Sequence, residues 1–302
     1  MTQFFSNPLP RSAYFRLMEH QGRIKPPSYE PDYPLIFFIS FSRIAAGLSL
    51  ISVFFQSSFL WTTIALGFMI LATISSIVHL NVPARFLTMV RNNRSHLVWE
   101  IRLAGALTTF LGLQFLSFLG WFQAYHALFP WVNFFLALLF LLSTGWAYRF
   151  ETHPAWRSWT LPLYYLASAS MLGIALCSIG SSSHLLPLFY TLLLLVQASL
   201  LGLYRNHLKL TSPMSLKKIL MGKEKWVFLS FLWATLFLPA LLTLALLIEG
   251  EVAMLNLVMA ISYSAGIFLE RILFFWVEKP IFFLSFIENP EINSKYPYWI
   301  RG

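Results

Sequence analysis

Long apolar runs alternate with short polar connections along most of this 302-residue chain. A helix needs roughly 20 mostly apolar residues to cross a bilayer, and eight runs approach or exceed that length. Only helices and closed barrels satisfy backbone groups in lipid, and runs this long exclude the barrel. The pattern therefore predicts an all-α, polytopic membrane helix bundle with both termini on the same side. The predicted spans are Pro34–Phe55, Phe59–Leu80, Leu97–Phe118, Trp131–Tyr148, Thr160–Ile179, Leu185–Tyr204, Trp226–Ile248 and Val252–Val277.

These spans divide the chain into three parts. Residues 34–277 form the predicted eight-helix membrane domain, and residues 278–302 form a C-terminal tail. Residues 1–33 contain prolines dense enough to resist helix formation, at positions 8, 10, 26, 27 and 31. We interpret this segment as an extended arm lying on a surface of a partner, with a disordered tail as the alternative.

Composition supports the membrane assignment. Charged residues make up 11% of the chain and hydrophobic residues 58%, whereas soluble domains are about 25% charged. Trp and Tyr gather near the ends of the apolar runs, which is typical of rings at headgroup level. Cys177 is the only cysteine, so this chain alone builds no intrachain disulfide and no Cys-rich zinc or iron–sulfur site.

The formal net charge of +9 is distributed very unevenly. Four connections contain no Lys or Arg: Gln56–Ser58, Gly120–Pro130, Gly180–His184 and Glu249–Glu251. The other connections and both termini carry the basic residues, and Lys and Arg accumulate on the cytoplasmic side of membrane proteins. We therefore expect a multi-pass protein of the bacterial cytoplasmic (inner) membrane with both termini cytoplasmic. Because topology accounts for the basic excess, we expect no nucleic-acid partner.

Three charged residues lie well away from the ends of the predicted spans. Arg43 is nine residues past Pro34, on the order of 13 Å into the bilayer at the rise of a helix, so it must face protein, water or a counter-charge. Glu270 and Arg271 lie about two turns from the cytoplasmic end of the last span. Adjacent helix residues do not face each other, so we expect them to serve different partners, one being Arg43 and the other Glu100.

His79 and Glu100 flank the basic second connection, and Arg102 follows one turn inside the third span. A histidine at a helix end often serves as a hydrogen-bonded cap, and a glutamate at a helix start is favoured by the helix dipole. Ionic clasps that only hold helices together are a further alternative. Clustering at one depth nevertheless favours a shared site in the cytoplasmic half, built from Arg43, His79, Glu100, Arg102, Glu270 and Arg271.

A redox-active quinone suits such a place. Its tail needs an apolar slot reached from lipid, and each two-electron step moves two protons, which requires titratable groups such as histidine, whose pKa lies near neutrality. A b-type haem would need axial ligands deep in facing spans. All seven histidines lie at span ends or in connections, so we expect no haem and no metal centre in this chain.

Residues from the first span to the last carry a family resemblance. They are Pro34-Leu35, Ala45-Ala46-Gly47, His79-Leu80 with Pro83 and Arg85, Ser95, Glu100-Ile101, Pro154, Trp156, Pro162, Gly266, Glu270, Arg271, Phe274 and Phe275. In these segments the chain resembles the membrane anchor subunit of dimethyl sulfoxide reductase-type molybdoenzymes. It departs from that pattern at Asn81-Val82, where a glycine normally follows His-Leu, and at residues 96–99 before the glutamate.

The resemblance implies a haem-free anchor for an iron–sulfur subunit and a molybdopterin catalytic subunit, with molybdopterin and iron–sulfur clusters only in those partners. It also implies electron exchange with menaquinone or ubiquinone. Glu100 stands at the position of the family's menaquinol-site glutamate, and His79 is the expected second member. We expect these two residues to relay protons, Arg43 or Arg271 to position a quinone carbonyl, and Arg102 and Glu270 to line the pocket.

Orientation favours one branch of this family. The charge pattern places the His79–Glu100 side in the cytoplasm, and residues 270–275 look more like the anchors of cytoplasmic sulfite-oxidising complexes. We therefore expect sulfite oxidation with electrons entering the quinone pool, and the basic sixth connection docking the iron–sulfur subunit. A quinol-oxidising anchor of a dimethyl sulfoxide or related reductase, a small-anion transporter and a purely structural anchor are the alternatives.

The far halves of the spans contain uncharged polar residues such as Thr108, Thr109, Gln114 and Gln197, but no charged residues. A proton pump needs titratable groups through the middle of the bilayer. The sequence therefore predicts proton exchange at the cytoplasmic side only.

Overall fold

The structure is a computed structural model that describes residues 33–55, 58–79, 96–147, 157–179, 185–222, 224–249 and 253–278. These ranges are helical with turns and contain no strand, and eight helical segments are long and apolar enough to cross a membrane. The predicted helix class and span number are thus confirmed. The spans are α2 (Tyr33–Ser52), α3 (Phe59–His79), α5 (His96–Phe118), α6 (Phe129–Ala147), α7 (Thr160–Cys177), α8 (Leu186–Thr211), the combined segment Lys225–Glu249, and α12 (Ala253–Glu278).

The connection after α8 differs most from the prediction. Helix α8 continues to Thr211 instead of ending at Tyr204, and a short helix, α9 (Pro213–Met221), follows at once. Pro213 explains the break, because proline has no N–H to continue the helix and disfavours helical geometry at the residue before it. A short 3₁₀ turn, η1 (Gln123–Tyr125), lies in the connection between α5 and α6.

The seventh span is not a uniform α-helix. It consists of α10 (Lys225–Leu232), a single π-helical turn η3 (Trp233–Phe237) and α11 (Leu238–Glu249). Pro239 explains the turn, because its ring removes the hydrogen bond to the carbonyl of Thr235 and crowds the preceding turn. A neighbouring helix compensates, since the Ser262 hydroxyl of α12 donates to the Ala234 carbonyl at 2.7 Å.

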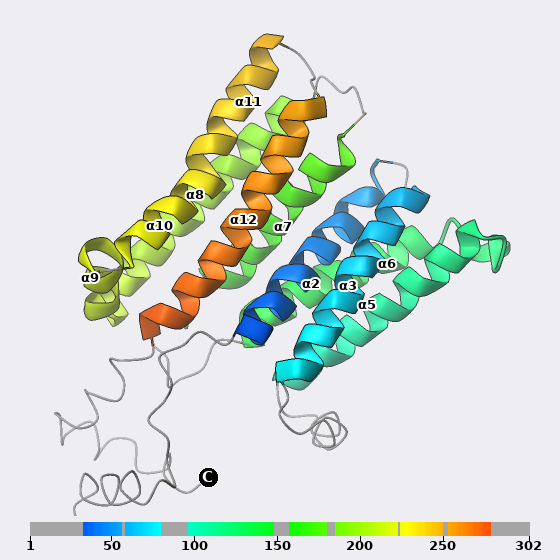
Figure 1. The fold of residues 1–302 in the computed structure, drawn as a ribbon, viewed down its shortest axis with the longest axis horizontal. Coiled ribbons are helices and arrows are strands. Elements are labelled where there is room, and N and C mark those ends of the chain that lie inside the picture. The colour runs from blue at the N-terminus through cyan, green and yellow to red at the C-terminus, as the bar shows by residue number, and fades with distance from the viewer. Residues whose placement is uncertain are drawn as a thin grey trace, which may run out of the picture.

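The eight spans form two groups of four (Figure 1). Helices α2, α3, α5 and α6 contact one another in the first group, and α7, α8, α10–α11 and α12 do so in the second. Helix α2 joins the groups by packing on both α7 and α12. Accordingly, 83% of the most apolar window of α2 and 78% of that of α7 are buried, compared with 22% for α3. The polar residues of α2 and α7 therefore lie in the centre of the bundle.

The contact between α2 and α7 depends on glycine. A Cβ placed on Gly47 would overlap the Ala169 carbonyl oxygen, and a Cβ on Gly173 would overlap the Gly47 carbonyl oxygen. Small residues at helix crossings let backbones approach closely in membranes. This close approach brings the side chains that flank it, including Arg43 and Ser168, into contact range.

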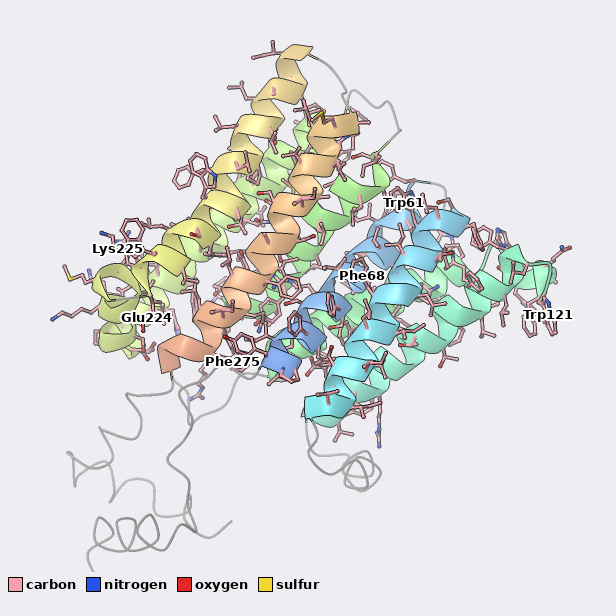
Figure 2. All side chains as sticks on the ribbon, viewed as in Figure 1. Trp61, Phe68, Trp121, Glu224, Lys225 and Phe275 are labelled. Carbon is pink, nitrogen blue, oxygen red and sulfur yellow. The ribbon has the colours of Figure 1, made fainter. Side chains whose placement is uncertain are left out.

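The surface of the bundle matches a lipid environment. Many large apolar side chains are exposed along the outer helices, and tryptophans lie at both ends of the bundle. Trp121, which is 64% exposed, lies in the turn after α5, and Lys225, the first residue of α10, lies at the other end of the bundle (Figure 2). Trp226, which is 72% exposed, follows Lys225 directly in α10. This arrangement agrees with the predicted placement of aromatic rings at the two membrane interfaces.

The ends of the membrane domain lie together. The first residue of α2 and the last residue of α12 are at the same end of the bundle (Figure 1). Residues 1–32 of the proline-rich arm, residues 80–95 with the basic second connection, and residues 279–302 of the C-terminal tail lie outside the described residues.

Candidate functional site

A buried ionic cluster joins the two helix groups. Arg43 projects from the middle of α2 and is 2% exposed; its Nη1 donates to Glu270 Oε2 of α12, and its Nη2 donates to the Ser168 hydroxyl of α7. The Ser168 hydroxyl in turn donates to the Tyr164 carbonyl at 2.8 Å. A charge at this depth is tolerated only when it is paired and hydrogen-bonded, and Arg43 meets both conditions.

A second arginine shares the same carboxylate. Arg271, which is fully buried, donates from Nη2 to Glu270 Oε1 at 3.1 Å. Neighbours in sequence therefore do contact each other here, contrary to the expectation that they would serve separate partners. The two oxygens of Glu270 thus accept from two different guanidinium groups.

Aromatic rings of α7 and α12 cover both guanidinium groups. The Tyr165 ring centroid lies 4.6 Å from the Arg43 guanidinium carbon and 4.1 Å from that of Arg271, and the Phe274 centroid lies 4.9 Å from the latter. Such contacts are favourable cation–π interactions, and they are stronger when desolvated. Tyr165 thus holds the two cations side by side in the interior.

Glu100 lies near the start of α5. Its side chain is completely buried, and neither carboxylate oxygen has a hydrogen-bond partner among the described residues. It interacts electrostatically with Arg271 and lies close to Thr144 of α6, whose hydroxyl donates to the Phe140 carbonyl at 3.0 Å. Buried carboxylates without hydrogen bonds are uncommon and call for an explanation. The expected link between Arg271 and Glu100 is therefore present as an electrostatic interaction.

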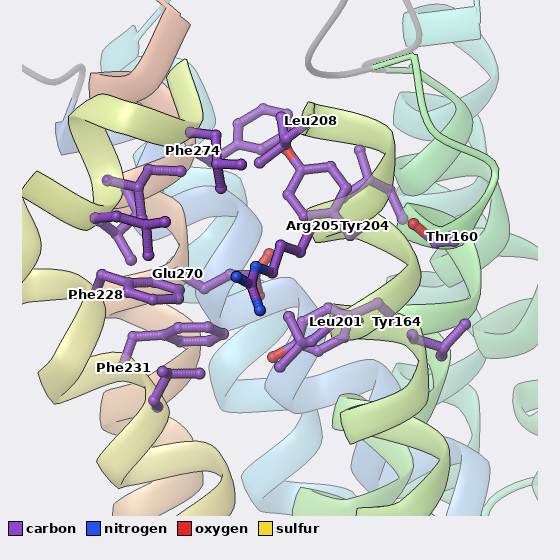
Figure 3. A pocket seen from close by; sticks show the side chains of 18 residues that line it. Thr160, Tyr164, Leu201, Tyr204, Arg205, Leu208, Phe228, Phe231, Glu270 and Phe274 are labelled. Carbon is purple, nitrogen blue, oxygen red and sulfur yellow. The ribbon is translucent and has the colours of Figure 1, made fainter. Parts of the chain in front are cut away.

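An apolar pocket of about 400 Å³ opens beside the cluster, between α7, α8, α9, α10 and α12. Glu270 lies in its wall, so the carboxylate that holds Arg43 and Arg271 also borders the pocket. Figure 3 shows the Arg205 side chain extending from α8 toward Glu270 across this space. The other walls are mostly aliphatic and aromatic, including Tyr164, Phe228, Phe231 and Phe274. The pocket combines an apolar lining with two ionisable groups.

The structure thus brings together four of the six predicted site residues: Arg43, Glu100, Glu270 and Arg271. Arg102 is only partly buried, and its guanidinium lies 5.5 Å from the ring centroid of Trp99, which is 49% exposed. His79 is the last residue of α3, and its side chain lies outside the described residues.

Several members of the cluster were absent from the prediction. They are Thr144, Tyr164, Tyr165, Ser168 and Arg205. The run Tyr164-Tyr165 followed by Ser168 in an apolar span was the available signal, because two rings and a hydroxyl on one buried helix can surround a cation. Within the described residues, no three His, Cys, Asp or Glu side chains form a group that could hold a metal ion.

Comparison with known proteins adds no relative. No family model matches the chain, and no curated protein matches it. The fold and the site therefore define its class by themselves: a membrane protein with eight helical spans and a charged cluster enclosed between two groups of four helices.

Proposed function

We propose that this chain is the quinone-reactive membrane anchor of a molybdopterin and iron–sulfur oxidoreductase. One observation carries the proposal: an apolar pocket inside a membrane bundle has, in its wall, a carboxylate that belongs to a buried ionic cluster. A quinone ring needs an apolar slot together with groups that bind its oxygens and exchange protons. Ligand pockets are in general mostly apolar with a few placed polar groups, as this one is.

The described residues supply the roles that quinone chemistry requires. A bound quinone carries two electrons and two protons per turnover. Glu270 and Arg205 border the pocket and offer a proton acceptor and a hydrogen-bond donor. Arg271 donates to Glu270 and also lies within electrostatic range of Glu100, whose carboxylate is fully buried beside Thr144. Glu100 is thus suited to pass protons between the pocket and the end of the bundle where α5 begins, with His79 as its proposed second member.

Partners and orientation belong to the same proposal. We place the basic end in the cytoplasm of a bacterial inner membrane, because four connections on the opposite side lack Lys and Arg. Arg205, Lys209, Lys217 and Lys225 lie around α9 at the basic end, where an acidic surface of an iron–sulfur subunit would dock. Sulfite oxidation feeding the quinone pool is the favoured reaction, and quinol oxidation for a dimethyl sulfoxide-type reductase is the alternative.

The first experiment asks what the chain assembles with. The tagged protein is solubilised from its native membrane and the purified material is analysed for co-eluting subunits, molybdenum, iron and quinone. We expect a molybdopterin subunit, an iron–sulfur subunit and bound quinone. Recovery of the chain alone, free of metal and quinone, would contradict the proposal, and anion flux in liposomes would then test the transporter alternative.

The second experiment tests the site in the intact complex. Glu100→Gln removes a titratable group while keeping its shape, and we expect quinone turnover to fall by about a hundredfold, as for loss of a general acid–base group. Glu249→Gln, the same change at the end of α11 on the opposite side of the bundle, is the matched control and should leave turnover unchanged. Equal turnover in both variants would refute the proton role of Glu100.

A further inference from the structure

Three polar residues on α12 lie on one face of that helix. Asn256, Tyr263 and Glu270 follow one another at intervals of seven residues, and residues so spaced lie almost in line along a helix. The row covers about 21 Å along the axis, at 1.5 Å per residue, which is most of the hydrocarbon thickness of a bilayer. It begins three residues after the start of α12 and ends at the ionic cluster.

Asn256 and Tyr263 of this row hydrogen-bond with side chains of α8, and the third residue, Glu270, accepts from Arg43 of α2 and from Arg271. At the far end, the Tyr190 hydroxyl donates to Asn256 Oδ1 at 3.1 Å and lies 3.0 Å from the Ser178 hydroxyl. In the middle, the Tyr263 hydroxyl donates to Gln197 Oε1 at 3.1 Å. All five side chains at the far end and in the middle are at most 1% exposed. Tyr190 and Gln197 are also seven residues apart, so α8 presents a parallel row.

Asn256, Tyr263 and Glu270, each with its polar partners, mark three successive layers of the row. Successive layers are about 10 Å apart along the axis, which is longer than one hydrogen bond, so transfer between them requires intervening water. The buried Gln197 Nε2 has no hydrogen-bond partner among the described residues, and such a donor in a polar interior is a normal site for an ordered water.

We propose that this row of side chains on α7, α8 and α12 conducts protons between Glu270 and the face of the membrane opposite the basic end. It extends the proposed function and rests on it. Reduction of one quinone takes up two electrons from the basic side and two protons, one through Glu100 from the basic side and one through the row from the far side; oxidation of one quinol releases the same particles in reverse. Charge therefore crosses the membrane in either direction, contrary to the sequence-based expectation of proton exchange at the cytoplasmic side alone.

The competing explanation is that these side chains only hold helices together, as polar residues often do in membranes. The first group of helices offers a matched control for that role. Asn133 Nδ2 of α6 donates to Gln114 Oε1 of α5 at 2.6 Å, and both residues are buried away from the row. Gln114→Leu therefore removes an interhelical amide of the same kind as Gln197→Leu does.

The test uses the intact complex in liposomes that contain a trapped pH dye. A membrane-impermeant substrate added outside selects complexes whose basic end faces outward, so that the far face borders the lumen. We expect luminal pH to change during quinone turnover. Gln197→Leu and Tyr263→Phe should lower the luminal protons moved per electron by about tenfold or more, as for loss of a proton-transfer group, while Gln114→Leu should leave that ratio unchanged.

The other possible outcomes of this liposome experiment decide between the inference and its alternatives. Quinone turnover without any luminal pH change overturns the inference and leaves the proposed function standing. An unchanged proton ratio in both row variants also overturns it, and shows that the row is structural. If Gln197→Leu prevents assembly, Tyr263→Phe, which keeps the ring and removes only the hydroxyl, decides the question. Absence of quinone turnover in the assembled wild-type complex refutes the proposed function and this inference together.

Discussion

Arg43 and Glu270, 227 positions apart in the chain, form an ion pair in the interior of the bundle. Arg43 belongs to the first group of four helices and Glu270 to the second. Removing one partner of a buried pair leaves a charge without compensation, which costs far more than the pair contributes in net stability. The pair therefore makes each helix group depend on the other, and this dependence can be measured.

Replacing Glu270 should lower the free energy of unfolding more than replacing Arg43 does. Glu270→Met leaves the Arg43 and Arg271 guanidinium groups without their shared carboxylate, and we expect a loss of about 3–5 kcal/mol. Arg43→Met leaves Glu270 bonded to Arg271, so we expect a smaller loss of about 1–3 kcal/mol. Denaturant unfolding of the purified chain in micelles measures both values, and the double variant supplies the coupling energy. Equal and additive losses would show that Glu270 does not link the two cations.

Glu100 should behave differently from Glu270 when its charge is removed. Neither Glu100 oxygen accepts a hydrogen bond from a described residue, so Glu100→Gln sacrifices no such bond. We expect its unfolding free energy to stay within about 1 kcal/mol of wild type, whereas Glu270→Gln, which disrupts bonds from two arginines, should cost more than that. The same unfolding assay compares the two variants. A larger cost for Glu100→Gln would assign Glu100 a structural role.

Much of this arrangement was accessible from the sequence. Arg43, Glu270 and Arg271 stand out because a charge within an apolar run must find a counter-charge, and the pairing of Arg43 with Glu270 was among the partners expected. Ser168 and Tyr165 were not identified, because serine and tyrosine are common in membrane spans. Only the close packing of α2 on α7 shows that they surround Arg43.

The row of polar residues on α12 shows a different limit of sequence-based prediction. The spacing of Asn256, Tyr263 and Glu270 is visible in the sequence, but a search restricted to charged residues passes over two of the three. Their significance depends on α8 presenting Tyr190 and Gln197 at matching heights.

Helix α9 was not predicted because it has only nine residues, too few for a search based on membrane spans.

The glycine contact between α2 and α7 predicts a steep steric response. Gly47→Ala would place a methyl group against the Ala169 carbonyl, and overpacking of this kind typically costs about 1–3 kcal/mol. Gly67→Ala in α3 is the matched control, because nothing lies within 4 Å of the added Cβ, and we expect no loss there. Thermal unfolding in micelles distinguishes the two. Equal stability of both variants would mean that the two helices are not in backbone contact.

The pocket predicts an effect on quinone binding that is separate from stability. Leu201 lines the pocket from α8, whereas Leu203 on the same helix is 45% exposed on the outer surface. Leu201→Trp adds bulk to a space of about 400 Å³, so the quinone must bind less well. We expect the KM for quinone in the assembled complex to rise about tenfold, equivalent to roughly 1.4 kcal/mol, with little change in thermal stability. Leu203→Trp adds the same side chain on the lipid side and should leave KM unchanged. If the two variants have the same KM, quinone does not occupy this pocket and must reach the ionic cluster from the Glu100 side.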